Sequence, residues 1–240
     1  MLKRIKRSKL QPSEYLEVRN SPKSVVSEQF RTLRSNILFT SADVEIKRLM
    51  ITSSEQGEGK STVSSNLALA FSQAGYKTLL IDADLRRPTQ HKLFQEINNK
   101  GLSNVIAGQI AFNDAVHKDI APYLDLLTSG PIPPNPSELL GSGAMVNLVQ
   151  SLNEHYDFII FDAPPVLAVT DAQVIGNLVN GSLLVVNSRN THRDKVIDSK
   201  TQLEKSSAKV LGVVLNELDK KEDGEYYYYY GEKTGGERQY

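Results

Sequence analysis

A glycine-containing stretch, Ser53-Ser54-Glu55-Gln56-Gly57-Glu58-Gly59-Lys60-Ser61-Thr62, follows the apolar run Leu49-Met50-Ile51. The apolar run predicts a buried parallel strand. A helix is predicted after the stretch, because apolar residues recur there at helical spacing, namely Val63, Leu67, Phe71 and Ala74. Glycines in such a turn let successive N–H groups curl around a polyphosphate, at the positive end of the helix dipole. The stretch therefore predicts a phosphate-binding loop.

The residue types in this loop predict how it would hold a nucleotide. In the pattern G-x-x-x-x-G-K-[ST], the lysine reaches the β and γ phosphates and the hydroxyl ligates Mg²⁺. Lys60, which we expect to be exposed, and Ser61 fill these positions, whereas Ser54 stands where the pattern has its first glycine. The alternative is a strand-to-helix turn with a chance lysine, and the flanking elements favour the phosphate loop. We expect ATP to be bound by Gly57, Glu58, Gly59, Lys60, Ser61 and Thr62.

Two further predicted strands end in acidic residues. The strand at residues 78–82 runs into Asp82-Ala83-Asp84, and the strand at residues 157–162 ends in Asp162, as in a Walker B pattern. In doubly wound sheets the ligand lies off the carboxyl ends of the strands, so these acids would face phosphates bound by the loop. Adjacent carboxylates repel unless a cation or solvent lies between them, which favours a metal ion over exposed loop acids.

Strands and helices alternate along the chain, which implies a parallel sheet covered by helices. Further strands are predicted at 124–127, 182–186 and 210–215, and helices at 26–39, 145–152, 172–179 and 195–206. Short helices are predicted between 88 and 119, and prolines make residues 129–136 a rigid, irregular loop. The predicted fold is α/β, a P-loop NTPase with a three-layer sandwich and a central, mainly parallel sheet. Asn216, just beyond the last strand, is placed to hydrogen-bond the base of the nucleotide.

The composition predicts one domain, at residues 25–218, with a tail at each end. Of 240 residues, 40% are hydrophobic, which suffices for a sizeable core. The formal net charge is zero, which gives no support for a nucleic-acid partner. The chain has no cysteine and no apolar run near the ~20 residues that span a bilayer. We expect a cytoplasmic protein.

The two expected tails differ in composition. Residues 1–24 begin with a basic cluster, for which a solvated tail is favoured over contact with an anionic membrane surface: Lys3, Arg4, Lys6, Arg7 and Lys9. Residues 219–240 are charged, show no apolar periodicity and are predicted to be disordered. They hold six of the ten tyrosines, namely Tyr226, Tyr227, Tyr228, Tyr229, Tyr230 and Tyr240. Because these six tyrosine rings are not expected to be buried in a hydrophobic core, they need another function.

These motifs together resemble the bacterial tyrosine kinases (BY-kinases) of capsule and exopolysaccharide synthesis, in particular the soluble kinase subunit of Gram-positive bacteria. The resemblance covers nearly the whole chain. It rests on residues 57–62 as Walker A, 79–86 as the second acidic motif (Walker A′), 158–162 as Walker B, residues 129–137 and the terminal tyrosines. Gln56-Gly57 stands where the family often has Pro-Gly, which should alter loop rigidity more than chemistry.

One further motif belongs to the resemblance. Glu28, Arg31 and Arg34 recur three residues apart on the helix predicted at 26–39, beside an apolar face of Phe30, Leu33 and Ile37. By itself this spacing indicates an ordinary solvated stripe. In the family, the pattern Glu-x-x-Arg-x-x-Arg is the motif of a ring interface, which assigns these three residues to a contact between subunits.

The resemblance implies a kinase that uses ATP and Mg²⁺ to phosphorylate tyrosines in the C-terminal tail of a neighbouring copy, within a ring. It implies activation by the cytoplasmic tail of a separate membrane protein, recruitment to the inner face of the plasma membrane, and a cognate phosphotyrosine phosphatase. Carried over by residue, Lys60 stabilises the transferring phosphoryl group, and Ser61, Asp84 and Asp162 form the metal shell. Asp82 accepts the tyrosine proton or orients the hydroxyl, since phosphoryl transfer depends mainly on positioning.

Two other functions are compatible with the sequence. A partition or septum-positioning ATPase shares the expected fold, but such proteins carry a signature lysine five residues before the Walker lysine, where this chain has Glu55. A nucleotide-binding scaffold without catalysis is disfavoured, because Lys60 and all three acids are present.

Overall fold

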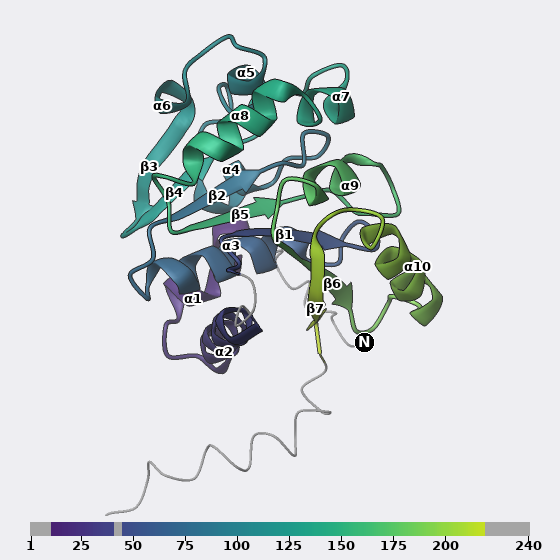
Figure 1. The fold of residues 1–240 in the computed structure, drawn as a ribbon. Helices are drawn as coiled ribbons and strands as arrows, with labels where there is room; N and C mark the ends of the chain where they lie inside the picture. The colour runs from purple at the N-terminus through teal and green to yellow at the C-terminus, as the bar shows by residue number, and fades with distance from the viewer. Residues whose placement is uncertain (1–10, 41–44, 219–240) are drawn as a thin grey trace, which may run out of the picture.

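The structure is a computed structural model that describes residues 11–40 and 45–218 and folds them around one seven-stranded sheet (Figure 1). The strands are β1 (Arg48–Ser53), β2 (Thr78–Asp82), β3 (Val116–Ala121), β4 (Leu124–Leu127), β5 (Phe158–Asp162), β6 (Gly181–Asn187) and β7 (Lys209–Asn216). They lie in the order β3-β4-β2-β5-β1-β6-β7. Neighbouring strands are parallel except for β3 and β4, which confirms the predicted mainly parallel sheet.

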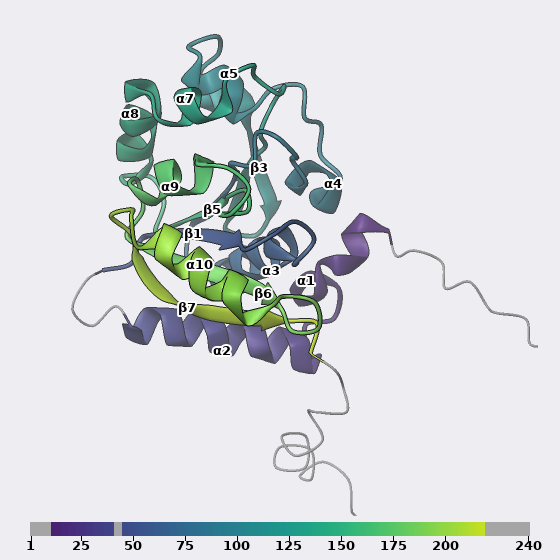
Figure 2. The same ribbon diagram turned by 90° about the vertical axis from the view of Figure 1, so that its right-hand side faces the viewer.

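Helices cover both faces of this sheet (Figure 1, Figure 2). One face packs on α1 (Glu17–Asn20), α2 (Val25–Thr40), α3 (Lys60–Ser72) and α4 (Gln90–Phe94). The other packs on α5 (Leu102–Ile106), α6 (Phe112–Ala115), α7 (Pro136–Leu140), α8 (Gly143–Leu152), α9 (Asp171–Gly176) and α10 (Arg193–Leu203). The two apolar cores lie on opposite sides of the strands, because successive side chains of a buried strand point to alternate faces. The predicted three-layer sandwich is confirmed.

The strand order brings the predicted motifs together. β1 lies between β5 and β6, and β5 lies between β1 and β2. Asp82 at the end of β2 is paired in register with Asp162 at the end of β5. Since parallel strands present their carboxyl ends at one edge of the sheet, the loop after β1 and both acidic motifs share that edge.

The sequence does not predict β3. Short helices form before it, as expected, but residues 116–121 then pair with β4 at the edge of the sheet. This strand is polar in its centre, with His117, Lys118 and Asp119, and none of its residues is fully buried. An edge strand is open to solvent, so it lacks the apolar run by which a buried strand is recognised.

The expected N-terminal tail is too long. Residues 12–20 fold into a 3-10 helix, η1 (Pro12–Tyr15), and α1, and Leu16 and Val18 are 1% and 0% exposed. Asn66 on α3 fixes this segment: Oδ1 accepts from the Val18 N–H at 2.9 Å, and Nδ2 donates to the Tyr15 carbonyl at 2.7 Å. Two isolated apolar anchors form no periodic pattern, so the sequence gives no signal for this segment.

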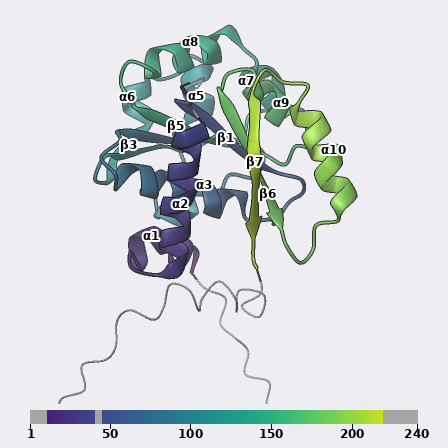
Figure 3. The same ribbon diagram turned by 60° about the horizontal axis from the view of Figure 1, so that its bottom comes forward.

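The remaining predicted elements match those of the structure to within a few residues. The predicted helix at 26–39 is α2, which lies beside α3 (Figure 3). Its apolar face of Phe30, Leu33 and Ile37 packs into the same core as α3. α3 ends at Ser72, and Gly75 follows it with φ +88°, as expected of a residue that stops a helix.

Several expectations concern residues that the structure does not describe. The basic cluster at 1–10 and the tyrosines at 226–230 and 240 lie outside the described residues. Within 11–40 and 45–218, no helix combines the length and the apolar character needed to cross a membrane.

Candidate functional site

The phosphate loop joins β1 to α3 through two glycines in the left-handed region. Gly57 has φ +86° and Gly59 has φ +92°, conformations that residues with a side chain rarely adopt. An added Cβ at Gly59 would also lie 2.0 Å from Nδ2 of Asn216, so that the Asn216 side chain would have to move. α3 begins at Lys60, so its first N–H groups border the loop. The loop therefore has the backbone of an anion-binding turn.

Side chains brace this loop from outside. Glu58 is 5% exposed, and its carboxylate accepts from the Glu55 N–H at 3.0 Å and from the Thr191 hydroxyl. Nδ2 of Asn216, predicted to contact a base, donates to the Glu58 carbonyl at 3.0 Å. The side chain and the carbonyl of Glu58 thus support the loop through contacts with Thr191 and Asn216.

Lys60 lies among the predicted acids. Its Nζ is 2.9 Å from Oδ2 of Asp84 and 3.4 Å from Oδ1 of Asp162. The expectation that Lys60 is exposed is wrong, since only 9% of the residue is accessible. Burial alone would lower the pKa of this ammonium group, but the charges of Asp162, Asp84 and Asp82 outweigh burial and raise its pKa. Lys60 therefore stays charged and neutralises these carboxylates.

Asp82 and Asp162 are register partners on β2 and β5, and both are 0% exposed. Oδ2 of Asp82 accepts from the N–H groups of Thr89 and Gln90, each at 2.9 Å. Oδ1 of Asp82 is buried and has no hydrogen-bond partner in the described part of the chain. Burial, together with repulsion from Asp162, raises the pKa of Asp82 to about 7. A buried carboxylate pair of this kind is stabilised by a nearby cation.

Two polar residues of this site, Gln90 and Asp171, carry no sequence signal. Gln90 begins α4, is 0% exposed, and donates through Nε2 to Oδ2 of Asp162 at 2.7 Å. Asp171 begins α9 and binds Arg86 through both oxygens, at 2.9 and 3.1 Å, and Ser137 donates to the same carboxylate. Asp171 thereby ties the second acidic motif to the proline-rich loop. Neither residue follows an apolar strand directly, so no pattern marks them.

A cavity of about 1190 Å³ opens over the phosphate loop. Its walls come from the loop itself, the segment after β2, the proline-rich loop and the end of β7, and include Lys60, Ser61, Asp84, Ile132 and Asn216. Asp82 and Asp162 do not line it but are buried beside Lys60. The structure therefore gathers the predicted nucleotide-site residues at one place, with Lys60 between the cavity and the buried acids.

The stripe on α2 is partly engaged within its own subunit. Arg31 pairs with Glu28 and also donates to the Pro22 carbonyl at 2.7 Å. Arg34 donates to the Ala70 carbonyl, on α3, at 2.8 Å. The Glu28 side chain is 65% exposed, which makes it the most open member of the stripe.

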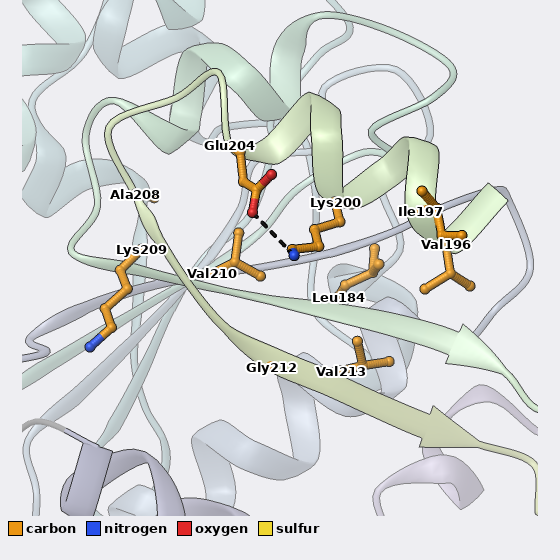
Figure 4. Close-up of a pocket in the computed structure, with 10 residues that line it drawn as sticks. All are labelled: Leu184, Val196, Ile197, Lys200, Glu204, Ala208, Lys209, Val210, Gly212 and Val213. Atoms are coloured by element: carbon orange, nitrogen blue, oxygen red, sulfur yellow. Dashed lines mark ion pairs between the residues drawn. The ribbon is translucent and has the colours of Figure 1, made fainter. Parts of the chain in front are cut away.

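A second hollow, of about 630 Å³, lies between α10 and the strands β6 and β7 (Figure 4). Apolar side chains line it, including Leu184, Val196 and Val213, and Lys200 pairs with Glu204 at 3.4 Å (Figure 4). None of the predicted site residues borders this hollow. The predicted residues Lys60, Ser61, Asp84 and Asn216 line the cavity over the phosphate loop instead.

The residues at the loop fit a magnesium ion. Mg²⁺ takes oxygen ligands and is usually held by one or two carboxylates together with substrate phosphates. Ser61 and Asp84 line the cavity, and Asp162 lies beside Lys60. Among residues 11–40 and 45–218, no group of three or more His, Cys, Asp or Glu side chains is arranged to hold a metal by itself. This donor set suits a metal that is bound together with a nucleotide.

Comparison with known proteins supports a kinase. A protein-family model described as an AAA domain matches residues 46–191. The tyrosine-protein kinase YwqD of Bacillus subtilis (strain 168) is 48% identical over 208 residues, 87% of this chain and 88% of that protein. CapB of Staphylococcus aureus is 46% identical over 95% of this chain and 98% of its own. The crystal structure of the chimerical protein CapA2B2 matches with a TM-score of 0.84 and 47% identity, over 86% of this chain and 91% of that one.

The septum-positioning ATPases share the fold at a lower level of similarity. The septum site-determining protein MinD of Pyrococcus horikoshii, solved with Mg-ADP, matches with a TM-score of 0.61 and 25% identity, over 70% of this chain and 69% of that one. Identity, coverage and TM-score are all higher for the kinases. The chain therefore belongs to the bacterial tyrosine kinases (BY-kinases), of the Gram-positive type, and is a tyrosine-protein kinase.

Proposed function

We propose that this kinase transfers the γ-phosphoryl group of ATP to tyrosines near the C-terminus of a neighbouring copy. The position of Lys60 carries the proposal: it begins α3, lines the cavity and contacts Asp84 and Asp162. One charged group thus joins the nucleotide loop to both acidic motifs. This arrangement suits phosphoryl transfer, in which catalysis consists mainly of positioning and charge neutralisation.

Each residue of the site receives a role in this proposal. The backbone of residues 57–62 holds the phosphates, and Lys60 stabilises charge on the transferring group. Asp82 is fully buried, which favours an orienting role over direct removal of the tyrosine proton. Asn216 lines the cavity, where it would contact the base. Ser61, Asp84 and Asp162 would hold Mg²⁺, which when bound neutralises charge on the β and γ phosphates.

The acids are expected to divide into two classes on substitution. Asp82→Asn should lower kcat about a hundredfold and leave ADP affinity nearly unchanged, because an orienting group acts in the transition state. Asp84→Asn and Asp162→Asn should raise the Mg²⁺ concentration for half-maximal rate about tenfold, because metal ligands also act in the ground state. Initial rates across a Mg²⁺ titration, with calorimetry for ADP, measure both effects.

A matched control for these variants is Asp194→Asn, in the exposed first turn of α10. It makes the same chemical change away from the cavity and should behave as wild type. Superimposable Mg²⁺ titration curves for the three site variants would refute the division of roles.

We infer that the proposed ring forms in part through α2. Glu28 is open to a partner, and apolar side chains nearby on the same helix are exposed as well: Val25 by 46%, Val26 by 42% and Phe39 by 79%. Aliphatic and aromatic side chains beside a charged stripe are common at protein interfaces. This combination supports an interface over a purely solvated stripe.

Replacing Glu28, Arg31 and Arg34 together by Ala should leave a folded, nucleotide-binding protein that no longer assembles and autophosphorylates slowly. The lost hydrogen bond from the charged Arg34 side chain to the Ala70 carbonyl costs about 1.5–3 kcal/mol, which is less than the stability of a typical domain. Light scattering under activating conditions reports the mass, and Gln29→Ala with Thr32→Ala, exposed on the same helix, is the control. An unchanged mass in the triple variant would show that these three residues form an ordinary solvated stripe and no subunit interface.

The wider role follows the family resemblance. We propose that the cytoplasmic tail of a separate membrane protein activates the kinase and recruits it to the inner face of the plasma membrane. A cognate phosphotyrosine phosphatase would reverse the modification, and the cycle would regulate the synthesis and export of a capsular or extracellular polysaccharide. A nucleic-acid partner has no place in this proposal, since the net charge is zero.

Incubation with labelled ATP and Mg²⁺, followed by phosphoamino-acid analysis, tests the proposed reaction. Phosphotyrosine is the expected product. Phosphate release without phosphotyrosine would indicate an ATPase switch, and nucleotide binding without either product would indicate a scaffold. At the position of the ATPase signature lysine this chain has Glu55, which pairs with Lys195.

A further inference from the structure

Gln90 bonds to three separate parts of the site. Its Nε2 donates to Oδ2 of Asp162 at 2.7 Å and to the Ser61 carbonyl at 3.1 Å, and its Oε1 accepts from the Ser65 hydroxyl at 2.6 Å. Its backbone N–H donates to Oδ2 of Asp82 at 2.9 Å. The residue is 0% exposed. One side chain therefore connects the Walker B strand, the phosphate loop and the helix that follows this loop.

The chemistry of these partners fixes the orientation of the Gln90 amide. A carboxylate and a carbonyl can only accept, so both must face the NH₂ group. The Ser65 hydroxyl lies against the amide oxygen and must donate to it. Neither a glutamate nor a leucine at position 90 could reproduce this pattern, because neither has a side-chain donor under neutral conditions.

Because of the hydrogen bond from Gln90, the two carboxylate oxygens of Asp162 have different partners. Oδ2 is taken by Gln90, whereas Oδ1 lies 3.4 Å from Nζ of Lys60 and 3.4 Å from the hydroxyl of Ser64. Oδ1 is thus the oxygen on the side of Lys60. Without Gln90 the Asp162 carboxylate could rotate about its Cβ–Cγ bond, since the χ2 angle of aspartate has a broad distribution.

We propose that Gln90 is a positioning residue for the metal-nucleotide complex, which holds Asp162 so that Oδ1 faces the nucleotide side. This inference rests on the proposed Mg²⁺-dependent reaction. Groups that hydrogen-bond a metal-ligating side chain typically change metal affinity by about 10–100-fold when they are removed. Gln90 acts here through Asp162 and does not itself touch the substrate.

A purely structural role makes a different prediction. If Gln90 only satisfied buried polar groups, its loss would destabilise the fold and would weaken nucleotide binding to the same extent with and without metal. If Gln90 positions Asp162, its loss reduces only the part of the affinity that Mg²⁺ adds. The difference between ADP binding with and without Mg²⁺ therefore separates the two roles.

The test compares the full-length wild type with Gln90→Leu, which keeps the size of the side chain and removes its three hydrogen bonds. Calorimetry measures ADP affinity with Mg²⁺ and with a chelator. We expect metal-free affinity to stay within about twofold of wild type, while the gain from Mg²⁺ falls at least about tenfold. The Mg²⁺ concentration for half-maximal kinase rate should rise by a similar factor.

Gln173→Leu is the matched control, because the side chain of Gln173 on α9 donates to Gln202, at 2.9 Å, and does not border the cavity. It should show the wild-type gain from Mg²⁺. If Gln90→Leu does not fold, Ser65→Ala removes the hydroxyl that holds the amide oxygen and should reduce the gain by a smaller factor. An undiminished gain in the folded variant overturns the role of Gln90. Absence of any gain in wild type would instead refute the proposed Mg²⁺-dependent function.

Discussion

Lys60→Met is expected to abolish autophosphorylation, with a loss of about 10²–10³-fold in kcat, or about 3–4 kcal/mol of transition-state stabilisation. The ammonium group lines the cavity over the phosphate loop and is held between Asp84 and Asp162. A preorganised charge in a partly desolvated site acts on the transferring phosphoryl group without further reorganisation. Methionine has a similar length and no charge, so the variant removes this single property. Phosphotyrosine formation from labelled ATP measures the loss.

The stability of this variant should also fall, which the sequence alone would not predict. An exposed loop lysine could be replaced without effect on the core, but Lys60 is buried and neutralises two carboxylates. Breaking a buried pair by removal of one partner commonly costs about 3–5 kcal/mol, part of which proton uptake by the carboxylates recovers. Lys200→Met, in an exposed pair with Glu204, is the control and should change neither property. A rate near that of wild type in Lys60→Met contradicts the proposed role.

The sequence was sufficient for the core of the site because its signals are local and positional. A strand, two left-handed glycines and a helix start are encoded within residues 49–62, and the acids follow apolar strands directly. The rule that ligands lie at the carboxyl ends of parallel strands then places the loop and these acids at one edge of the sheet. Lys60, Asp82, Asp84 and Asp162 were therefore predictable as one cluster, and the structure confirms that they lie together.

The missed features have the opposite character, since each depends on contacts between distant residues. Gln90 and Asp171 matter because α4 and α9 bring them to Asp162 and Arg86. The N-terminal segment is held through Asn66, a polar residue inside a helix that offers no sequence signal of a tertiary role. The burial of Lys60 likewise results from three strands meeting at one edge. Contacts of this kind, between residues far apart in the chain, cannot be predicted from any single segment of the sequence.

Replacing Tyr226 to Tyr230 and Tyr240 by Phe should remove nearly all phosphate incorporation. The change keeps the rings and removes the acceptor hydroxyls, so loss of labelling identifies the acceptors. Tyr15 and Tyr123 remain in the variant and are exposed by 45% and 61%, which makes them internal controls for modification of accessible tyrosines. Peptide mapping by mass spectrometry locates the phosphate. Labelling that persists at the wild-type level would show that other residues are the acceptors.

Transfer between copies is tested by mixing two proteins, neither of which should label itself. Lys60→Met retains the proposed acceptor tyrosines, and the tyrosine-to-phenylalanine variant retains the active site, so the mixture should phosphorylate the Lys60→Met chain alone.

Phosphorylation is expected to change the charge of the tyrosine segment. Each phosphate adds about −1.5 to −2 charges, so five modified tyrosines carry roughly −7 to −10. Like-charge repulsion between such phosphorylated segments should expel them from neighbouring copies and open the assembly. Light scattering before and after phosphorylation measures this disassembly, and a fully phosphorylated wild type that stays assembled contradicts it. In the mixing experiment, absence of label on the Lys60→Met chain contradicts transfer between copies.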